Sequence, residues 1–160
     1  MGLPEINIEF IGKAVTAIKR SQLGIVALIL KDDVQTADTL TYKSIEEVPT
    51  EGWSPANLDY IEKTFMGTPS KIIVERLSTT AADYNAALTR LNNKRFNYLA
   101  IPGIEDKDTT NIASWIKSKR LNQKKTFKAV LPNNEADHEG IINFTTTGIK
   151  VGEKEYTTAE

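Results

Sequence analysis

The stretch LGIVALIL, residues 23–30, is almost wholly apolar and ends at the charged triplet Lys31-Asp32-Asp33. An apolar run of this length is typical of a strand that is buried on both faces of a sheet. A helix is the weaker interpretation, because the run is short, is partly β-branched and has no polar side. We therefore expect residues 23–30 to form a buried strand.

Segments typical of strands alternate with segments typical of helices in the middle of the chain. The expected strands are residues 71–77, 96–101 and 126–131. Each expected helix has a start signal: Ser54 with Pro55 at the first helical position, Ser78–Thr80, and Asp108–Thr110. The apolar faces of the three helices are Leu58, Ile61 and Phe65; Tyr84, Leu88 and Leu91; and Ile112, Trp115 and Ile116. This alternation predicts parallel neighbouring strands and a layered α/β domain.

Weaker signals lie on either side of this alternation. Residues 39–42 could form a short strand, Ser44–Glu47 fits a capping box, and Gly67 stands where a helix-ending glycine belongs. Residues 141–145 are typical of a strand and residues 148–156 of a β-hairpin. Thr157 to Glu160 is again a capping-box pattern, which predicts the start of a further segment; the alternative is a frayed tail with a chance match. We expect an arm at 1–20, an α/β domain at 21–156 and a truncated following segment at 157–160.

The first twenty residues contain a strand pattern without an obvious hairpin partner. Polar and apolar residues alternate from Glu5 to Phe10, so Ile6, Ile8 and Phe10 would share one face of an extended segment. Two interpretations remain open. The segment is an edge strand of its own domain, or it is an arm that pairs with the sheet edge of a neighbouring molecule.

Composition excludes several classes of protein. The chain has 160 residues, 20 of them Lys or Arg and 21 Asp or Glu, so its formal net charge is −1. The lack of cysteine excludes disulfide scaffolds, thiolate metal sites and cysteine nucleophiles, and one histidine excludes a multi-histidine site. The balanced charge argues against nucleic-acid binding, and no apolar run reaches the roughly 18 residues of a membrane span. We expect a protein that is not an enzyme and uses no cofactor.

Polar residues follow each expected strand, where parallel α/β proteins bind ligands. Their oxygen atoms suit Mg²⁺, and an Asp-Asp pair after a first strand is similar to the phospho-acceptor site of receiver domains. Against this hypothesis, no Lys follows Pro132 and loops at strand ends are commonly polar. His138 has no nucleophile motif near it and is interpreted as a surface loop residue. The polar set is Asp32 and Asp33; Ser78, Thr79 and Thr80; Gly103, Glu105 and Asp106; and Asn133, Asn134, Glu135 and Asp137.

Several short motifs, taken in order, resemble one family. The chain resembles the N-terminal half of contractile tail sheath proteins of myophages and of phage-tail-like particles from Gram-positive prophages. The similarity extends over essentially all 160 residues, and its motifs are diffuse rather than catalytic. The residues that carry it are Gly2–Phe10, Ala14–Ile18, Arg20–Gln22, Gly24–Ala27, Tyr42–Ile45, Asn57–Ile61, Phe65–Gly67 and Pro69–Arg76.

This resemblance implies a structural subunit made in the bacterial cytoplasm and assembled into a tail. Family members stack as six-membered rings around a tail tube above a baseplate, and contraction drives the tube through the target cell envelope. Extended arms complete a sheet in the C-terminal domain of a neighbouring subunit. The donated arm here would be residues 3–20, with Ile6, Ile8, Phe10, Val15 and Ile18 as anchors. Family sheaths are much longer, so the resemblance also implies a C-terminal half after Glu160.

Overall fold

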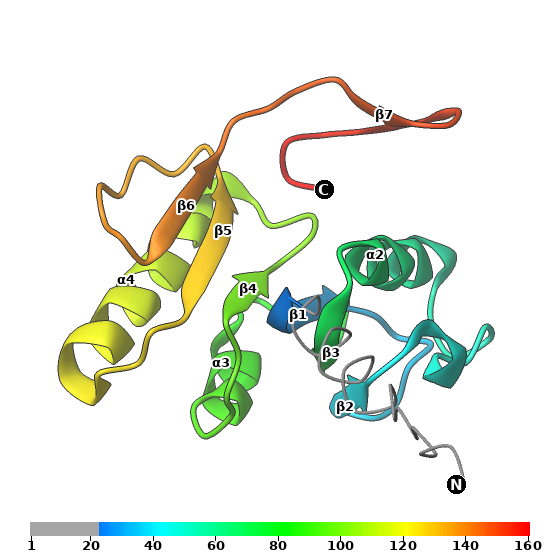
Figure 1. Ribbon diagram of the computed structural model, residues 1–160, viewed down its shortest axis with the longest axis horizontal. Helices are drawn as coiled ribbons and strands as arrows, with labels where there is room; N and C mark the ends of the chain where they lie inside the picture. Colours follow the sequence, from blue (N-terminus) through cyan, green and yellow to red (C-terminus); the bar gives the residue numbers. More distant parts are fainter. Residues whose placement is uncertain (1–22) are drawn as a thin grey trace, which may run out of the picture.

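We describe residues 23–160 in a computed structural model of the chain. In this range a six-stranded sheet has helices on both faces, and a separate two-stranded hairpin follows it (Figure 1). The strand order is β2-β3-β1-β4-β5-β6, with β2 antiparallel to β3 and the other neighbours parallel. The predicted α/β layered fold is therefore confirmed. The elements are β1 Leu23–Lys31, β2 Thr39–Tyr42, the 3₁₀ helix η1 Ile45–Glu47, α2 Pro55–Met66, β3 Pro69–Leu77, α3 Asn85–Leu91, β4 Tyr98–Ala100, α4 Asp106–Gln123, β5 Lys128–Pro132, β6 Ile141–Phe144, β7 Ile149–Val151 and β8 Lys154–Tyr156.

Strand β1, formed by the apolar run, lies in the interior of the sheet between β3 and β4. Its side chains alternate between the two faces. Ala27 and Ile29 pack in one hydrophobic cluster, while Leu28 and Leu30 pack in the other. Each of these four side chains is at most 2% exposed, which confirms the prediction of a strand buried on both faces.

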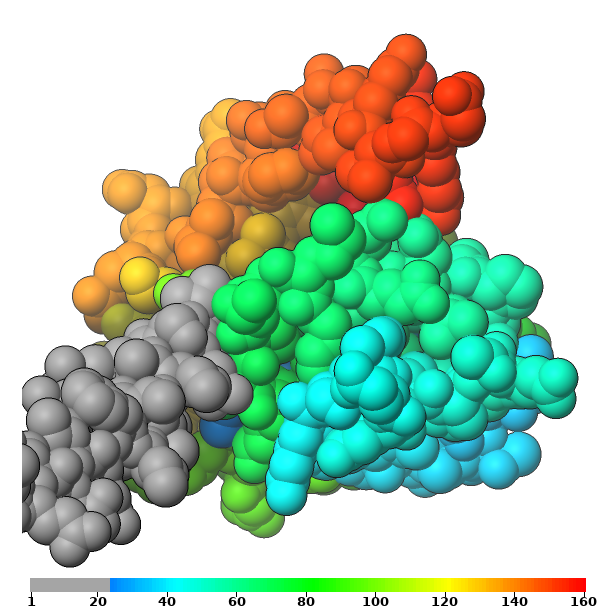
Figure 2. All heavy atoms as spheres, turned by 45° about the vertical axis from the view of Figure 1, so that its right-hand side comes forward, coloured from blue at the N-terminus to red at the C-terminus, as the bar shows by residue number. Residues whose placement is uncertain are grey.

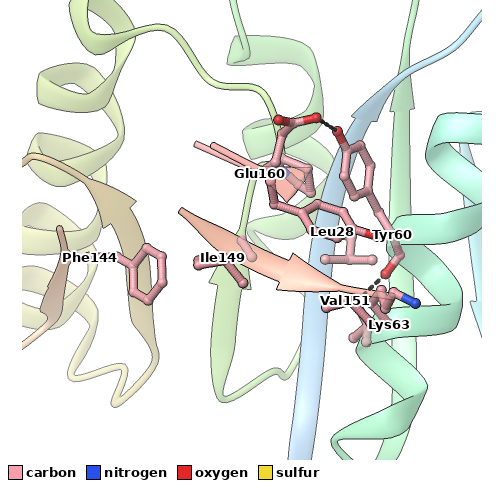
Figure 3. A pocket seen from close by; sticks show the side chains of 11 residues that line it. Leu28, Tyr60, Lys63, Phe144, Ile149, Val151 and Glu160 are labelled. Carbon is pink, nitrogen blue, oxygen red and sulfur yellow. Dashed lines mark hydrogen bonds between the residues drawn. The ribbon is translucent and has the colours of Figure 1, made fainter. Parts of the chain in front are cut away.

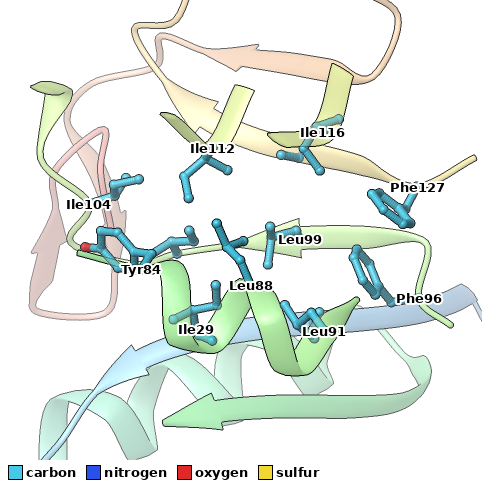
Figure 4. Packing of buried hydrophobic residues seen from close by; sticks show 14 of the residues in the cluster. Ile29, Tyr84, Leu88, Leu91, Phe96, Leu99, Ile104, Ile112, Ile116 and Phe127 are labelled. Carbon is cyan, nitrogen blue, oxygen red and sulfur yellow. The ribbon is translucent and has the colours of Figure 1, made fainter. Parts of the chain in front are cut away.

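The larger hydrophobic cluster lies between the sheet and helices α3 and α4 (Figure 4). The predicted faces of both helices enter it. Leu88 and Leu91 of α3 and Ile112 and Ile116 of α4 are buried, and Trp115 packs against them. This face of the sheet is covered from β3 to β5.

The smaller cluster lies under α2 on the opposite face. Ile61 is fully buried there, and Leu58 and Phe65 pack around it, as the helical periodicity predicts. Trp53 closes the cluster near β2 and donates a 3.1 Å hydrogen bond from Nε1 to the hydroxyl of Tyr42. Helix α2 is the only α-helix of residues 23–160 on this face, and it lies over the β3 side of the sheet (Figure 1).

The expected helix starts are partly wrong. Helix α3 begins at Asn85 rather than near Thr80, because Ser78 and Thr79 bind the carboxylate of Asp33 instead of capping a helix. Helix α4 begins at Asp106, two residues before the predicted cap. Local capping patterns compete here with tertiary hydrogen bonds, and the tertiary bonds decide the boundary.

Two predicted caps take a different form. Ser44 makes no side-chain capping bond, and the carboxylate of Glu47 accepts the backbone N–H of Lys43 at 2.7 Å. Gly67 ends α2 with φ −76°, so the left-handed residue is the next one, Thr68, with φ +50°. A helical segment therefore follows Ser44 and α2 ends at Gly67, as predicted, although neither residue has the expected capping geometry.

The predicted hairpin is confirmed as β7 and β8, with Gly152 in the left-handed region at φ +62°. Before it, β5 and β6 pair in parallel through a loop of residues 133–140 that contains no helix. Lys117 of α4 supports this loop by donating to the carbonyl of Ala136 at 2.9 Å. The predicted arm residues Ile6, Ile8, Phe10, Val15 and Ile18 lie outside the described residues.

Candidate functional site

The carboxylate of Asp32, at the end of β1, is a buried acceptor rather than an open ligand site. It is 1% exposed and accepts five hydrogen bonds: from the N–H of Val34, Gln35 and Ser54, the Ser54 hydroxyl and the Asn57 side chain, at 2.7–3.1 Å. Burial alone would raise the pKa of Asp32. The donations, led by that of Asn57, outweigh burial and hold this pKa well below its usual range.

Asp33 points to the next strand along the sheet edge. Its carboxylate accepts hydrogen bonds from Ser78, from the backbone and hydroxyl of Thr79, and from Arg76 at 3.4 Å. The hydroxyl and backbone donations of Thr79 are the main reason that the pKa of Asp33 is lowered. The two adjacent carboxylates therefore bind different segments: Asp32 binds the start of α2, and Asp33 binds the loop after β3. Both segments are thereby attached to the end of β1.

The Mg²⁺ or receiver-like interpretation gains no support from this geometry. The oxygen atoms of Asp32 and Asp33 are engaged by donors of the chain itself. Farther along the edge, Glu105 pairs with Lys107 at 2.7 Å. Within residues 23–160, no group of three or more His, Asp or Glu side chains is arranged to hold a metal ion.

The loop after β5 binds α4 through Asn134. Its side chain donates to the hydroxyl of Thr109 at 3.0 Å, and its backbone N–H donates to Asn143 at 2.8 Å. The ring of His138 accepts the N–H of Gly140 at 3.0 Å, within the same loop. His138 is thus part of a loop turn, as the interpretation of a loop residue predicts.

A buried ion cluster beneath α3 was not predicted from the sequence. Glu75 of β3 is fully buried and contacts Arg90 at 2.6 Å, Lys94 at 3.3 Å and the hydroxyl of Thr39 at 2.8 Å. It joins β2, β3 and α3. Glu75 is two residues from each of the core residues Ile73 and Leu77, so its side chain points to the same buried face of the strand. The period-two alternation of strand side chains could therefore have predicted its burial.

The C-terminal segment contacts α2 through a second polar cluster. Asp59 accepts a hydrogen bond from Lys154 at 2.9 Å and one from Tyr156 at 2.7 Å. The hydroxyl of Tyr60, the residue after Asp59, donates to Glu160 at 2.8 Å. The hydrogen bond from Lys154 is the main cause of a lowered pKa of Asp59, whereas burial, followed by the bond to Glu160, raises the pKa of Tyr60. In Figure 2 the red C-terminal residues lie above the α2 region.

An apolar groove lies between α2, the hairpin and the sheet (Figure 3). Its volume is about 320 Å³, and Phe144 of β6 points into it from the side opposite α2. It contains no cluster of nucleophiles or acid–base pairs, and its residues with polar groups are Tyr60, Lys63, Thr64, Tyr156 and Glu160. The lining is typical of a packing surface rather than of a catalytic site. Its apolar lining residues are Leu28, Ala100, Pro102, Phe144, Ile149 and Val151.

Three comparisons with known proteins give the same class. Residues 78–160 match the family described as phage tail sheath protein central domain. A tail sheath protein of Clostridium phage phiCD119 is 38% identical over 169 residues, which cover 98% of this chain and 46% of that protein. Crystal structures of sheath tail proteins from Desulfitobacterium hafniense and Listeria innocua share the fold, with TM-scores of 0.73 and 0.64 at 15% and 17% identity.

The fold and the sequence thus define a structural protein of phage tails. The chain belongs to the phage tail sheath protein family. It spans about half the length of these relatives: 46% of the Clostridium phage protein, 56% of the Desulfitobacterium chain and 54% of the Listeria chain, while the two crystal chains match 86% and 81% of it. No helix within residues 23–160 is both long and apolar enough to cross a membrane.

Proposed function

We propose that this chain is the N-terminal part of a contractile tail sheath subunit. The subunit stacks as six-membered rings around a tail tube, above a baseplate, and contracts to drive the tube through the target cell envelope. The observation that carries the proposal is the match of residues 78–160 to the sheath family, together with a fold shared with two sheath proteins. The subunit is made in the bacterial cytoplasm and joins the virion tail or a phage-tail-like particle.

The chemistry of the described residues supports a role in assembly rather than catalysis. The buried carboxylates of Asp32 and Glu75 join segments of the chain, and their partners are all within the domain. A contracting sheath needs rigid subunits whose mutual contacts rearrange, and internal hydrogen-bond networks of this kind make the domain rigid.

The first twenty residues are proposed as the joint between subunits. Ile6, Ile8, Phe10, Val15 and Ile18 would anchor an extended segment against the sheet of a neighbouring subunit. Pairing of backbone groups suits such a joint because it survives when side-chain contacts between subunits change.

Assembly of the full-length subunit tests the proposal. The longer protein, produced with its tail tube protein, is expected to form striated tubes that negative-stain electron microscopy resolves. The triple variant Ile6→Asp, Ile8→Asp and Phe10→Asp should abolish tubes, whereas Glu5→Gln with Glu9→Gln, which alters the opposite side of the same segment, should keep them. Discrete small complexes from the unchanged protein would contradict the sheath function; tubes from the triple variant would contradict only the role of the arm.

A further inference from the structure

Within residues 23–160, one half of the α2 face of the sheet has no helix over it. Leu99, Ala129 and Leu131 pack toward α3 and α4, so their neighbours in β4 and β5 point to the opposite face. Tyr98 and Ile142 on that face are 41% and 38% exposed. Parallel sheets are normally covered on both faces, so this exposure is unusual for β4, β5 and β6. The side chains of this open half are Tyr98, Ala100, Val130, Ile142 and Phe144, with Lys128 at its amino end.

The last four residues lie at the edge of this open half. The backbone N–H of Gly103, just after β4, donates to the carbonyl of Ala159 at 2.8 Å. Ala159 and Glu160 line a second hollow with Ala100, Val130 and Phe144. The Tyr60 hydroxyl of α2 donates to the Glu160 side chain from the other side, so the end of this segment lies between α2 and the residue that follows β4 by three positions, Gly103.

These four residues already form part of the hydrogen bonding of a helix start, and the hydroxyl of Thr157 also donates to the carboxylate of Glu160 at 2.9 Å. The carboxylate of Glu160 accepts the N–H of Thr157 at 3.1 Å, which is one of the two reciprocal bonds of a capping box. The N–H of Glu160 donates to the carbonyl of Thr157 at 3.2 Å, which closes a first turn. Tyr156, directly before this turn, is 7% exposed and occupies the position of the first residue of a hydrophobic staple.

We propose that in the longer sheath subunit a helix begins at Thr157 and covers the open half of the sheet over β4, β5 and β6. The Clostridium phage relative is about twice as long as this chain, since the matched part is 46% of it, so it contains residues enough for such a helix. The first turn lies at the edge of the open half, so the helix needs no long connection to reach it. The helix is amphipathic, with Thr157 as its N-cap, and its N4 residue, directly after Glu160, is apolar and packs on Tyr156. This inference does not depend on ring stacking or contraction.

Thiol reactivity tests which residues are covered, because the chain has no cysteine. Ile142→Cys and Tyr98→Cys place a thiol on the open half. Val34→Cys is the control, at an apolar position that is 56% exposed in the loop after β1. Each variant is made in the 160-residue chain and in the same chain extended by the stretch that follows the matched region in the Clostridium phage relative. Reaction with a small aromatic disulfide is followed by absorbance.

The two thiols on the open half should react readily in the shorter chain and at least about tenfold more slowly in the extended one, with the control unchanged. Equal rates in both chains would overturn the proposal. So would protection already present in the shorter chain: loss of that protection on dilution would assign the surface to a second copy, and loss on deletion of residues 1–22 would assign it to that segment.

A peptide version covers the case in which the extended chain does not fold. A peptide that starts at Thr157 and continues through the same stretch is added to a chain ending at Tyr156. Slower reaction of the Ile142→Cys and Tyr98→Cys thiols, with an unchanged Val34→Cys control, supports the proposal. Unchanged rates at millimolar peptide would overturn it.

Discussion

The hydroxyl of Tyr156 donates a 2.7 Å hydrogen bond to the carboxylate of Asp59, 97 residues earlier in the chain. Lys154 donates to the same oxygen at 2.9 Å. Together they attach the hairpin to α2, and the hairpin forms one wall of the apolar groove. The position of the hairpin therefore depends in part on one partly buried carboxylate, while Tyr60 and Gly103 bind the residues after the hairpin.

Acid is expected to release the hairpin from α2. The pKa of Asp59 is lowered from its ordinary value of 3.8, chiefly by the hydrogen bond from Lys154, and the pKa of Glu160 is also lowered, chiefly by the backbone of Thr157. The released form therefore binds protons more readily than the attached form. Attachment is fully stable above the ordinary pKa and is lost as the pH falls through the lowered value. Amide shifts of residues 149–156 should change together with a midpoint below 3.8.

In the variant Asp59→Asn, the amide shifts of residues 149–156 at neutral pH should already equal those of the unchanged protein in acid. The uncharged Asn side chain cannot form an ion pair with Lys154. Lys150→Ala is the matched control: it removes only an exposed pair with Glu155 at 3.5 Å within the hairpin. A hairpin that keeps its neutral-pH shifts in Asp59→Asn would show that other contacts hold it in place.

The adjacent residues Asp32 and Asp33 should differ greatly in their effect on stability. Asp32→Ala leaves five donors without their acceptor in a buried site, and we expect it to lower the free energy of unfolding by about 3 kcal/mol or more. Asp33→Ala should cost much less, because water can replace Asp33 on the exposed donors of Ser78 and Thr79. Urea unfolding followed by the fluorescence of the two tryptophans, Trp53 and Trp115, compares the two variants. Equal midpoints would contradict the distinct roles of the two carboxylates.

The sheet and its helices could be predicted from periodicity, because each element has its own apolar pattern. The run at 23–30 and the faces of α3 and α4 are examples: their hydrophobic residues form the core that the pattern implies. Helix starts were less predictable. Ser78 and Thr79 have the chemistry of caps, but the same hydroxyls also suit Asp33, and only the tertiary structure brings that partner near.

The polar clusters could be predicted least. Asp59 and Lys154 are far apart in the sequence, and each is an ordinary surface residue in its own element. The open half of the sheet is a similar case. A single sequence shows which residues of β4 and β6 are apolar, but it does not show whether a helix covers them. The strand order and the path of the chain after β6 decide this, and both depend on contacts between distant segments.

Gly24 is required by a close contact within the sheet, and this gives the last prediction. A Cβ at Gly24 would lie 2.5 Å from Oδ1 of Asn97 and 2.8 Å from its Cβ. The side chain of Asn97 cannot turn away without loss, because its Oδ1 accepts the N–H of Ile25 at 2.7 Å. Gly24→Ala should therefore lower the free energy of unfolding by about 1–3 kcal/mol.

The matched control for Gly24→Ala is Gly67→Ala at the end of α2. There φ is −76° and the nearest atom to an added Cβ is the carbonyl oxygen of Thr64 at 3.3 Å, so we expect a change within about 0.5 kcal/mol. The double variant Gly24→Ala with Asn97→Gly should recover part of the stability lost in Gly24→Ala, because it removes the obstructing side chain together with its Cβ, which would lie 2.8 Å from the added methyl group. If the double variant is less stable than Gly24→Ala alone, the hydrogen bond from the Ile25 N–H to Asn97 contributes more to stability than the clash removes.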